Sequence, residues 1–545
     1  MQFKAAIEWS HCAHKHQNID STLEAYTTAF KLLPRISWLG LTIASRHHAL
    51  LRYAIHLARN GAAASLLAGD LEQALEWLEQ GRSVVWGQLL QLRSPIDDLY
   101  EINLDLAMRL SSVALALEKE GCKENSLMSA SQSDAKISPE QAIQKNHQLA
   151  DKWDSLVKCA QKLPGFEHFM LPKQFSELRQ ATFHCPVVVL NISIYRCDAL
   201  IVESPSMPPH QVHLENLTYR KAQALQITLQ KILSADGIRD RTEERHGESA
   251  FEDHSCANEV FRHLLAELWS SVVRPVLDCL KSCQAENGPF RICWCPTGPL
   301  MFLPIHAAGV YNADGLALVS LADIAISSYT PTLSALLNRS PQRDKKPAFK
   351  FLAVIQPNAP GGNPLPGTIE ELKGLQKHVP TSSLQILKGP DATTTTVLSG
   401  MEECSWVHLA CHGIQDVSDP MQSGLLLQDG RLKLSRIIQK HITHAEFVFL
   451  SACQTATGDE RRPEEAIHLA AGMLVAGFKG VIGTTWSIRD NDAPFVADKV
   501  YGQLLKNGEP SGVHPAVALH EAVQELRKRS GPNFSSWVPF IYMGA

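Results

Sequence analysis

Short, continuously apolar runs separated by helix-like segments are the most constraining feature of this 545-residue sequence. Five of these runs follow one another in the second half of the chain, at residues 290–295, 351–355, 405–410, 446–452 and 479–485. A strand that is apolar on both sides must be buried on both sides, as in a parallel sheet that helices cover on each face. We therefore expect an α/β/α domain with a mostly parallel sheet in this part of the chain.

The segment between the last two runs shows how the helices of this domain are predicted. Pro463 suits the first turn of a helix, and Glu464 and Glu465 complement the helix dipole there. The helix is expected over residues 466–476, with Gly477 as its stop signal. The resulting strand–helix–strand unit should cross over with right-handed topology.

Residues 1–120 have a helical pattern instead, in which apolar residues recur every three or four positions. One helix is predicted to end near Gly69, and Asp70 can cap the next. The buried stripe of that second helix is predicted to be Ala74, Leu75 and Leu78. Segment 67–81 resembles part of a tetratricopeptide repeat, but its weaker copy at 21–30 lies 52 residues away, not the repeat's roughly 34. The repeats are therefore divergent, and a plain helical bundle is the alternative.

Changes in composition divide the chain into three predicted parts. The N-terminal part, residues 1–120, is the helical region with tetratricopeptide-like repeats. Residues 121–182 form a helical connector that begins with a polar, Ser-rich loop. Residues 183–545 form the α/β/α domain, which opens with a β-branched hairpin at 186–203.

Charge and cysteine usage exclude several classes of function. A net charge of −5 gives no general basic surface for nucleic acid or for an anionic membrane, and no apolar run approaches the roughly 20 residues of a membrane-spanning helix. The first residues show no apolar core followed by a small-residue cleavage site, so we do not expect a secretory signal. The 13 scattered cysteines indicate reduced thiols in a cytoplasmic protein, or a nuclear one. Neither the cysteine spacing nor any other motif predicts a metal site or a cofactor.

Two reactive side chains follow the ends of two of the apolar runs. His412 comes just after 405–410, and Cys453 comes just after 446–452. If these two strands are adjacent and parallel, both residues lie at the carboxyl-end edge of the sheet, where ligands of open α/β sheets bind. A thiol is mostly protonated at neutral pH, so a neighbouring imidazole can take its proton and later protonate a leaving amine. The backbone N–H groups of Gly413 and Cys453 are candidates for an oxyanion hole.

The same segments contain a second cysteine and a second histidine. Cys411 is a strand neighbour of His412 and should point to the opposite face, as a core thiol. His408 lies in the middle of its strand and is expected to be a core residue with satisfied hydrogen bonds. The joint placement at two strand ends therefore favours His412 and Cys453 as the reactive pair.

Seven stretches occur in the order typical of one family: 296–306, 329–333, 408–413, 449–455, 470–477, 483–488 and 537–544. They resemble the motifs of the CHAT domain family, which are caspase-like modules often found after tetratricopeptide repeats and related to caspases and separases. The resemblance implies a caspase-like α/β/α fold over roughly residues 185–545. It further implies a catalytic dyad of His412 and Cys453, with Gly413 as the glycine that supplies an oxyanion amide.

The segment Trp486–Asp492 resembles the one that carries acidic residues in separases. Asp490 and Asp492 match acidic positions, whereas Ser487 stands where separases usually have an aspartate. An exposed aspartate there can bind a basic substrate side chain, but a solvated acid or a helix cap is the alternative. The Gly/Pro-rich stretch 358–367 lacks the spacing of a phosphate-binding loop and is interpreted as a loop on the substrate side.

Two functional hypotheses follow. The first is a cysteine endopeptidase of the caspase or separase type that acts on a protein or peptide substrate. Its helical repeats would then bind a protein partner and regulate it. The second is a non-catalytic interaction scaffold built on a caspase-like domain, since a fold does not by itself determine function.

Overall fold

The computed structural model describes residues 2–82, 84–92, 96–121, 139–235, 254–280, 288–337, 349–416, 420–440, 442, 444–452 and 469–544. The chain forms two compact units, Met1–Gln174 and Phe175–Ala545.

The first unit is helical. Its helices are α1 (Gln2–Lys15), α2 (Ile19–Ile36), α3 (Ile43–Tyr53), α4 (Leu57–Leu67), α5 (Leu71–Gln80), α6 (Val84–Leu92), α7 (Asp97–Ile102), α8 (Leu104–Gly121) and α9 (Pro139–Ala160). The helix-turn-helix predicted at 67–81 is confirmed as α4 and α5. Asp70 caps α5 by accepting a hydrogen bond from the backbone N–H of Gln73, and the left-handed φ of 82° at Gly69 makes the turn. Whether these helices are tetratricopeptide repeats stays a prediction.

The predicted apolar stripe of α5 is buried. Ala74, Leu75 and Leu78 have exposed fractions of 0%, 1% and 2%. Trp77 joins them and stacks on Phe30 of α2, with ring centroids 5.1 Å apart. The stripe thus packs α5 against α2 and α4, while α8 and α9 pack on a second core.

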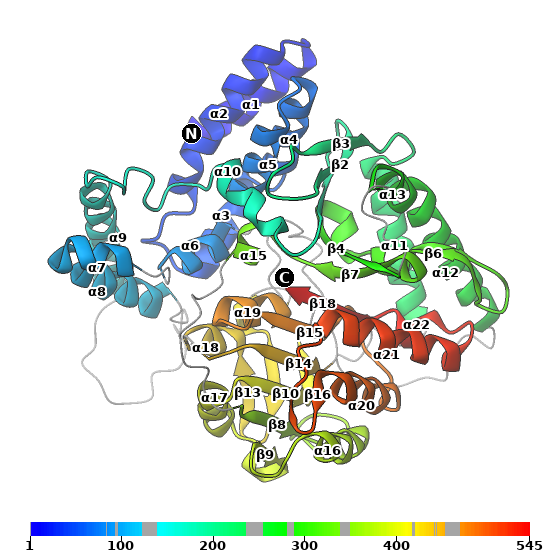
Figure 1. The fold of residues 1–545 in the computed structure, drawn as a ribbon. Coiled ribbons are helices and arrows are strands. Elements are labelled where there is room, and N and C mark those ends of the chain that lie inside the picture. Colours follow the sequence, from blue (N-terminus) through cyan, green and yellow to red (C-terminus); the bar gives the residue numbers. More distant parts are fainter. Residues whose placement is uncertain are drawn as a thin grey trace. The chain divides into compact units, whose positions relative to one another are not determined.

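The second unit is built on a single large sheet. Within its described residues, eleven strands run in the order β3 (His210–His213), β2 (Cys197–Val202), β1 (Val187–Ile192), β4 (Phe290–Pro296), β7 (Ala325–Tyr329), β18 (Phe540–Gly544), β15 (Gly480–Thr484), β14 (Phe447–Ser451), β10 (Trp406–Ala410), β8 (Phe351–Ile355) and β9 (Leu384–Lys388) (Figure 1). The five apolar runs of the sequence correspond to β4, β8, β10, β14 and β15. Every residue of the last four strands is buried.

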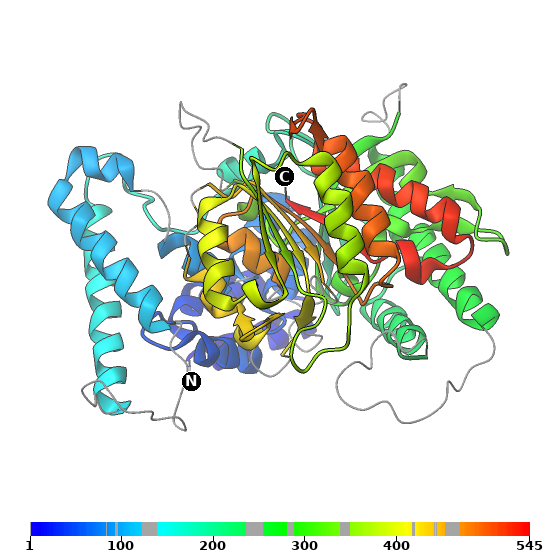
Figure 2. The same cartoon turned by 90° about the horizontal axis from the view of Figure 1, so that it is seen from below.

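Helices cover both faces of this sheet. Helices α16 (Gly367–His378), α20 (Asp492–Leu504) and α21 (Pro515–Ser530) share one core with alternate strand residues such as Phe351 and Phe449. Helices α17 (Thr394–Glu403), α18 (Leu434–Ile438) and α19 (Leu469–Ala476) lie on the other face, where Leu352 meets Gly400 of α17 (Figure 2). The predicted fold class, a helical N-terminal region followed by an α/β/α domain with a mostly parallel sheet, is confirmed.

The sheet departs from uniform parallel pairing at three places. β1, β2 and β3 are antiparallel neighbours, and the first two form the hairpin predicted at 186–203. The C-terminal strand β18 lies antiparallel to β15 but parallel to β7, so the strands on its two sides run in opposite directions. Helix α19 (Leu469–Ala476) ends before Gly477, as predicted, and the φ of Gly477 is 121°. Its predicted first turn, from Pro463 to residue 466, lies outside the described residues.

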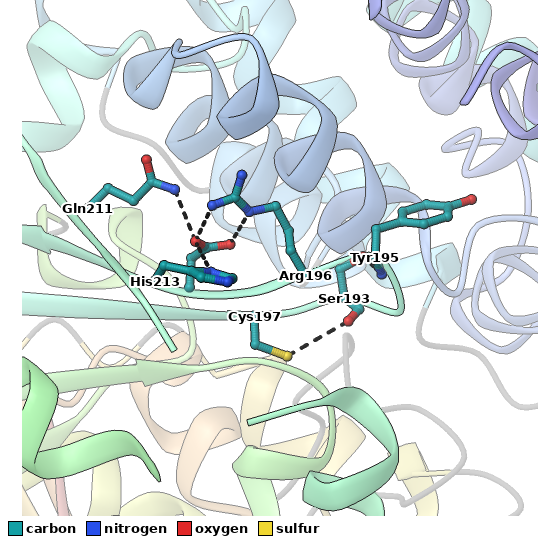
Figure 3. A network of polar contacts seen from close by, with 7 residues as sticks. Ser193, Tyr195, Arg196, Cys197, Gln211 and His213 are labelled. Carbon is teal, nitrogen blue, oxygen red and sulfur yellow. Dashed lines mark hydrogen bonds and ion pairs between the residues drawn. The ribbon is translucent and has the colours of Figure 1, made fainter. Parts of the chain in front are cut away.

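A buried carboxylate links β2 to β3, the outermost strand on one side of the sheet. Asp198 on β2 is fully buried, and its oxygens accept two hydrogen bonds of 2.7 Å from Arg196. From β3, Gln211 donates to the same carboxylate over 2.9 Å, and Nδ1 of His213 lies 3.2 Å from it. Figure 3 shows Gln211 and His213 of β3 and Arg196 of the turn before β2 directed toward this carboxylate. Burial of a charge is tolerated only with such partners, so the network is structural.

Candidate functional site

The relation between β10 and β14 decides whether the two predicted reactive residues can meet. These strands are adjacent and parallel, and their register pairs Ala410 with Ser451. The two strands therefore end at the same edge of the sheet, and in the sequence His412 and Cys453 each follow this pair by two residues. Cys453 itself lies outside the described residues, and its pairing with His412 stays a prediction.

His412 begins the short strand β11 (His412–Ile414) and is partly exposed. Its Nε2 lies 2.7 Å from the backbone carbonyl oxygen of Asn363. Because a carbonyl only accepts, Nε2 must carry a proton and donate it, which leaves Nδ1 of the neutral ring as the unprotonated nitrogen. The imidazole is therefore oriented as a base that can accept a proton at Nδ1.

The loop that supplies this carbonyl joins β8 to α16. It packs closely on the imidazole: a Cβ atom at Gly362 would lie only 2.7 Å from Cδ2 of His412, so this position accepts only glycine without movement of the ring. The loop is pinned to the sheet where Gln356 N–H donates to the carbonyl of Ala410, over 2.9 Å. It thus holds His412 from the side of β8.

A hydrogen bond from a side chain also fixes the end of β14. The hydroxyl group of Thr484, which is fully buried on β15, donates to the carbonyl oxygen of Ala452 over 3.0 Å. The hydroxyl of Ser451 is buried without a hydrogen-bond partner among the described residues. The peptide immediately before Cys453 is thereby held against β15.

The two alternative residues are buried, as expected. Cys411 is 1% exposed. His408 is fully buried, with Nδ1 3.0 Å from the Tyr501 hydroxyl and Nε2 3.0 Å from Oε2 of Glu371, although the latter pair does not meet hydrogen-bond geometry. Burial, followed by the charge of Glu371, raises the pKa of Tyr501 well above its usual range. Both side chains are therefore less accessible than that of His412.

The two predicted substrate-binding aspartates both have partners inside the protein. Oδ2 of Asp490 accepts a 2.7 Å hydrogen bond from the backbone N–H of Gly367, the first residue of α16. Asp492 begins α20 and accepts a hydrogen bond from the Ser536 hydroxyl. Both residues remain partly exposed, and their binding of a basic substrate side chain stays a prediction.

Gly413, the predicted oxyanion residue, lies in β11 opposite Leu425 of β12 (Gly424–Leu427). It follows His412 directly and is partly exposed. Its position beside the base agrees with the predicted role, which stays a prediction because the partner amide belongs to Cys453.

Another titratable cluster lies around a cavity of about 40 Å³ that is lined by residues of β7, β18 and α21. There Nε2 of His306 lies 2.8 Å from the carbonyl of Val538, and Nδ1 lies 2.8 Å from the Tyr329 hydroxyl. Burial lowers the pKa of His306 to about 4, so this histidine is neutral at physiological pH. With both ring nitrogens occupied, it is structural.

No group of metal-binding side chains occurs in the described part of the chain. Among the described helices, none is long and apolar enough to cross a membrane.

A family model described as CHAT domain matches residues 262–545. Among solved structures, the Saccharomyces cerevisiae separase–securin complex is similar at 10% identity and a TM-score of 0.48, over 99% of this chain and 44% of that chain. The Arg-specific cysteine proteinase gingipain R is similar at 10% identity and a TM-score of 0.34, over 50% of this chain and 67% of that chain. This chain therefore spans less than half of the separase chain. No curated protein matches the sequence.

The sequence did not indicate that Asn363 or Gly362 contacts His412. Asn363 acts through its backbone carbonyl, which every residue possesses, and 49 residues separate it from His412. The one available signal was the position of the Gly/Pro-rich loop directly after a strand that turned out to be the neighbour of β10.

Proposed function

Because the chain belongs to the CHAT domain family, we propose that it is a cysteine endopeptidase with His412 as base and Cys453 as nucleophile. The observation that carries the proposal is the parallel register of β10 and β14, whose carboxyl ends lie at one edge of the sheet. In the sequence, His412 and Cys453 each come two residues after these ends. The hydrogen bond from His412 to Asn363 supports it, because this bond leaves Nδ1 available for a thiol proton.

In the proposed first step, Nδ1 of His412 takes the thiol proton and the thiolate of Cys453 attacks the carbonyl carbon of a peptide bond. The negative charge moves to the carbonyl oxygen, where the N–H groups of Gly413 and Cys453 would stabilise it. The carbonyl of Asn363 accepts from Nε2 and so favours the imidazolium that forms, as an aspartate does in other triads.

The intermediate then collapses. The C–N bond breaks, and the proton on Nδ1 goes to the leaving amine, which leaves an acyl group on the Cys453 sulfur. Water attacks this thioester while Nδ1 takes one of its protons, and the thiolate departs with the bond electrons. The products are two peptide fragments and the original dyad, so no cofactor is needed.

The decisive test compares the wild type with Cys453→Ala and His412→Ala. A peptide probe with an acyloxymethyl ketone group should label the wild type at Cys453, and it should label neither variant at an appreciable rate. Hydrolysis of protein substrates should likewise be lost in both. Hydrolysis that survives Cys453→Ala would exclude the proposed nucleophile.

A second candidate function is a non-catalytic interaction protein. One observation favours it: Leu104, Met108 and Leu115 lie on one face of α8 and are 58%, 51% and 68% exposed. Exposed apolar stripes are typical of protein-binding surfaces. Absence of any labelling at Cys453 in the wild-type protein would support this function over the first. If the dyad is active, we propose that this helical unit binds a regulatory protein.

A further inference from the structure

We propose that Asp490 is a positioning residue for His412 and not a ligand of the substrate. Its carboxylate anchors the first turn of α16, and through the segment before that turn it sets the place of the Asn363 carbonyl. This inference rests on the proposed function, because it assigns a role in the same dyad.

Two hydrogen bonds and the short segment between them connect Asp490 to His412. Asp490 accepts from the Gly367 N–H over 2.7 Å, and Asn363 accepts from His412 Nε2 over the same distance. Only three residues separate Asn363 from Gly367. A displacement of Gly367 is therefore expected to move the Asn363 carbonyl, and with it the imidazole of His412.

The intervening segment is stiff. Two of its three residues are Pro364 and Pro366, whose rings restrict φ to about −65°. The third, Leu365, donates its N–H to the carbonyl of Pro357 over 2.8 Å. A segment with so few free torsions transmits a shift of Gly367 to Asn363 instead of absorbing it.

The contact between Asp490 and the helix start is close as well as polar. A Cβ atom at Gly367 would lie 2.2 Å from the Asp490 backbone oxygen, so the two backbones touch. The helix N-terminus also has unpaired N–H groups and a partial positive charge, which a carboxylate stabilises. Both features fix the position of Gly367 relative to Asp490.

This geometry disfavours the role in substrate binding that the sequence suggested. A carboxylate that binds an arginine side chain frequently uses both oxygens, in a bidentate pair. In Asp490, Oδ2 is already engaged by Gly367. We therefore assign its carboxylate to the loop and not to the substrate.

The experiment compares Asp490→Ala and Asp490→Asn in the full-length protein. Two acyloxymethyl ketone probes are used, one with arginine and one with leucine before the reactive group. We expect Asp490→Ala to slow labelling of Cys453 about tenfold with both probes, and to shift its pH profile. Asp490→Asn should restore most of the rate, since the amide oxygen can accept the same bond from Gly367.

The control is Asp498→Ala. Asp498 lies on α20 and also contacts α16, but at the C-terminal end of α16, where it lies 3.1 Å from Nε2 of His378. It should lower thermal stability while leaving the labelling rate within about twofold of the wild type. A loss with the arginine probe alone, in both Asp490 variants, would show that Asp490 binds substrate and would overturn the proposal. Unchanged labelling in Asp490→Ala would overturn it equally.

A second readout separates this inference from the proposed function. Histidine ¹⁵N NMR reports the tautomer of His412 without any chemistry at Cys453, and a His412→Gln sample identifies its signals. We expect the Nε2–H tautomer in the wild type and a mixture in Asp490→Ala. If the wild type is not labelled but this change occurs, the positioning role stands and the peptidase function fails. If the tautomer is the same in both, the positioning role fails.

Discussion

At the residue scale, the orientation of one imidazole determines what the site can do. His412 has an ordinary backbone position at the start of a strand, and its chemistry is set by the partner of Nε2. A backbone carbonyl is a neutral acceptor, so it fixes the tautomer without the desolvation cost of a buried carboxylate. Gly362 completes this arrangement, because the absence of a side chain lets the loop approach the ring.

Replacement of Gly362 by alanine should disturb this arrangement directly. The new Cβ would lie 2.7 Å from Cδ2 of His412, so the ring must move. Since a misplacement of about 1 Å can cost roughly 100-fold in rate, we expect labelling of Cys453 to slow by ten- to hundredfold. The melting temperature should change little, because the φ of Gly362 is not in the left-handed region.

The matched control is Gly374→Ala, in the middle of α16. Its Cβ would lie 3.4 Å from the Asp498 carboxylate, an ordinary contact, and alanine favours a helix more than glycine does. This variant should be labelled at the wild-type rate and should be slightly more stable. Wild-type labelling in Gly362→Ala would contradict the role assigned to this loop.

At the element scale, the register of parallel strands brings the site together. β8, β10 and β14 are consecutive neighbours, so the loop after β8, His412 after β10 and the end of β14 lie at one edge. The opposite direction of the strands beyond β18 places the carboxyl ends of β1, β4 and β7 at the other edge. Only the first of these two edges therefore carries His412 and the end of β14.

The pairing of β2 with the outermost strand β3 is stabilised by the carboxylate of Asp198. Replacement by alanine would leave the guanidinium of Arg196, whose side chain is only 17% exposed, without its bidentate partner. Breaking a buried pair in this way typically costs about 3–5 kcal/mol, so we expect the free energy of unfolding to fall by about 3 kcal/mol. Urea denaturation followed by circular dichroism measures the change.

Gln211→Ala provides the comparison at this edge. It removes one donor to the same carboxylate and leaves the ion pair with Arg196 intact. Its cost should therefore be about 1.5 kcal/mol, the low end of the usual range for one hydrogen bond to a charged group. Equal losses in the two variants would mean that Asp198 and Arg196 contribute nothing beyond a single hydrogen bond.

At the scale of the whole molecule, the chain consists of two compact units, Met1–Gln174 and Phe175–Ala545. Each has its own apolar core, the first around α5 and the α8–α9 pair and the second along the sheet. Units with separate cores are expected to unfold separately. We predict two transitions in differential scanning calorimetry of the full chain.

An inhibitor that reacts with Cys453 identifies the transitions. Because it binds only the second unit, labelling should raise one transition temperature and leave the other unchanged. A single transition, with equal calorimetric and van't Hoff enthalpies, would show that the units unfold as one.

The sequence by itself determined the strands and helices, because burial on both faces leaves a continuous apolar run and a helix leaves a period of about 3.6 residues. It also singled out His412 and the turn at Gly69 and Asp70, where a special residue type is needed. Only the tertiary structure decided strand order, the antiparallel place of β18 and the partners of Asp490. These depend on contacts between residues far apart in the chain, and a backbone carbonyl such as that of Asn363 has no residue type to reveal it.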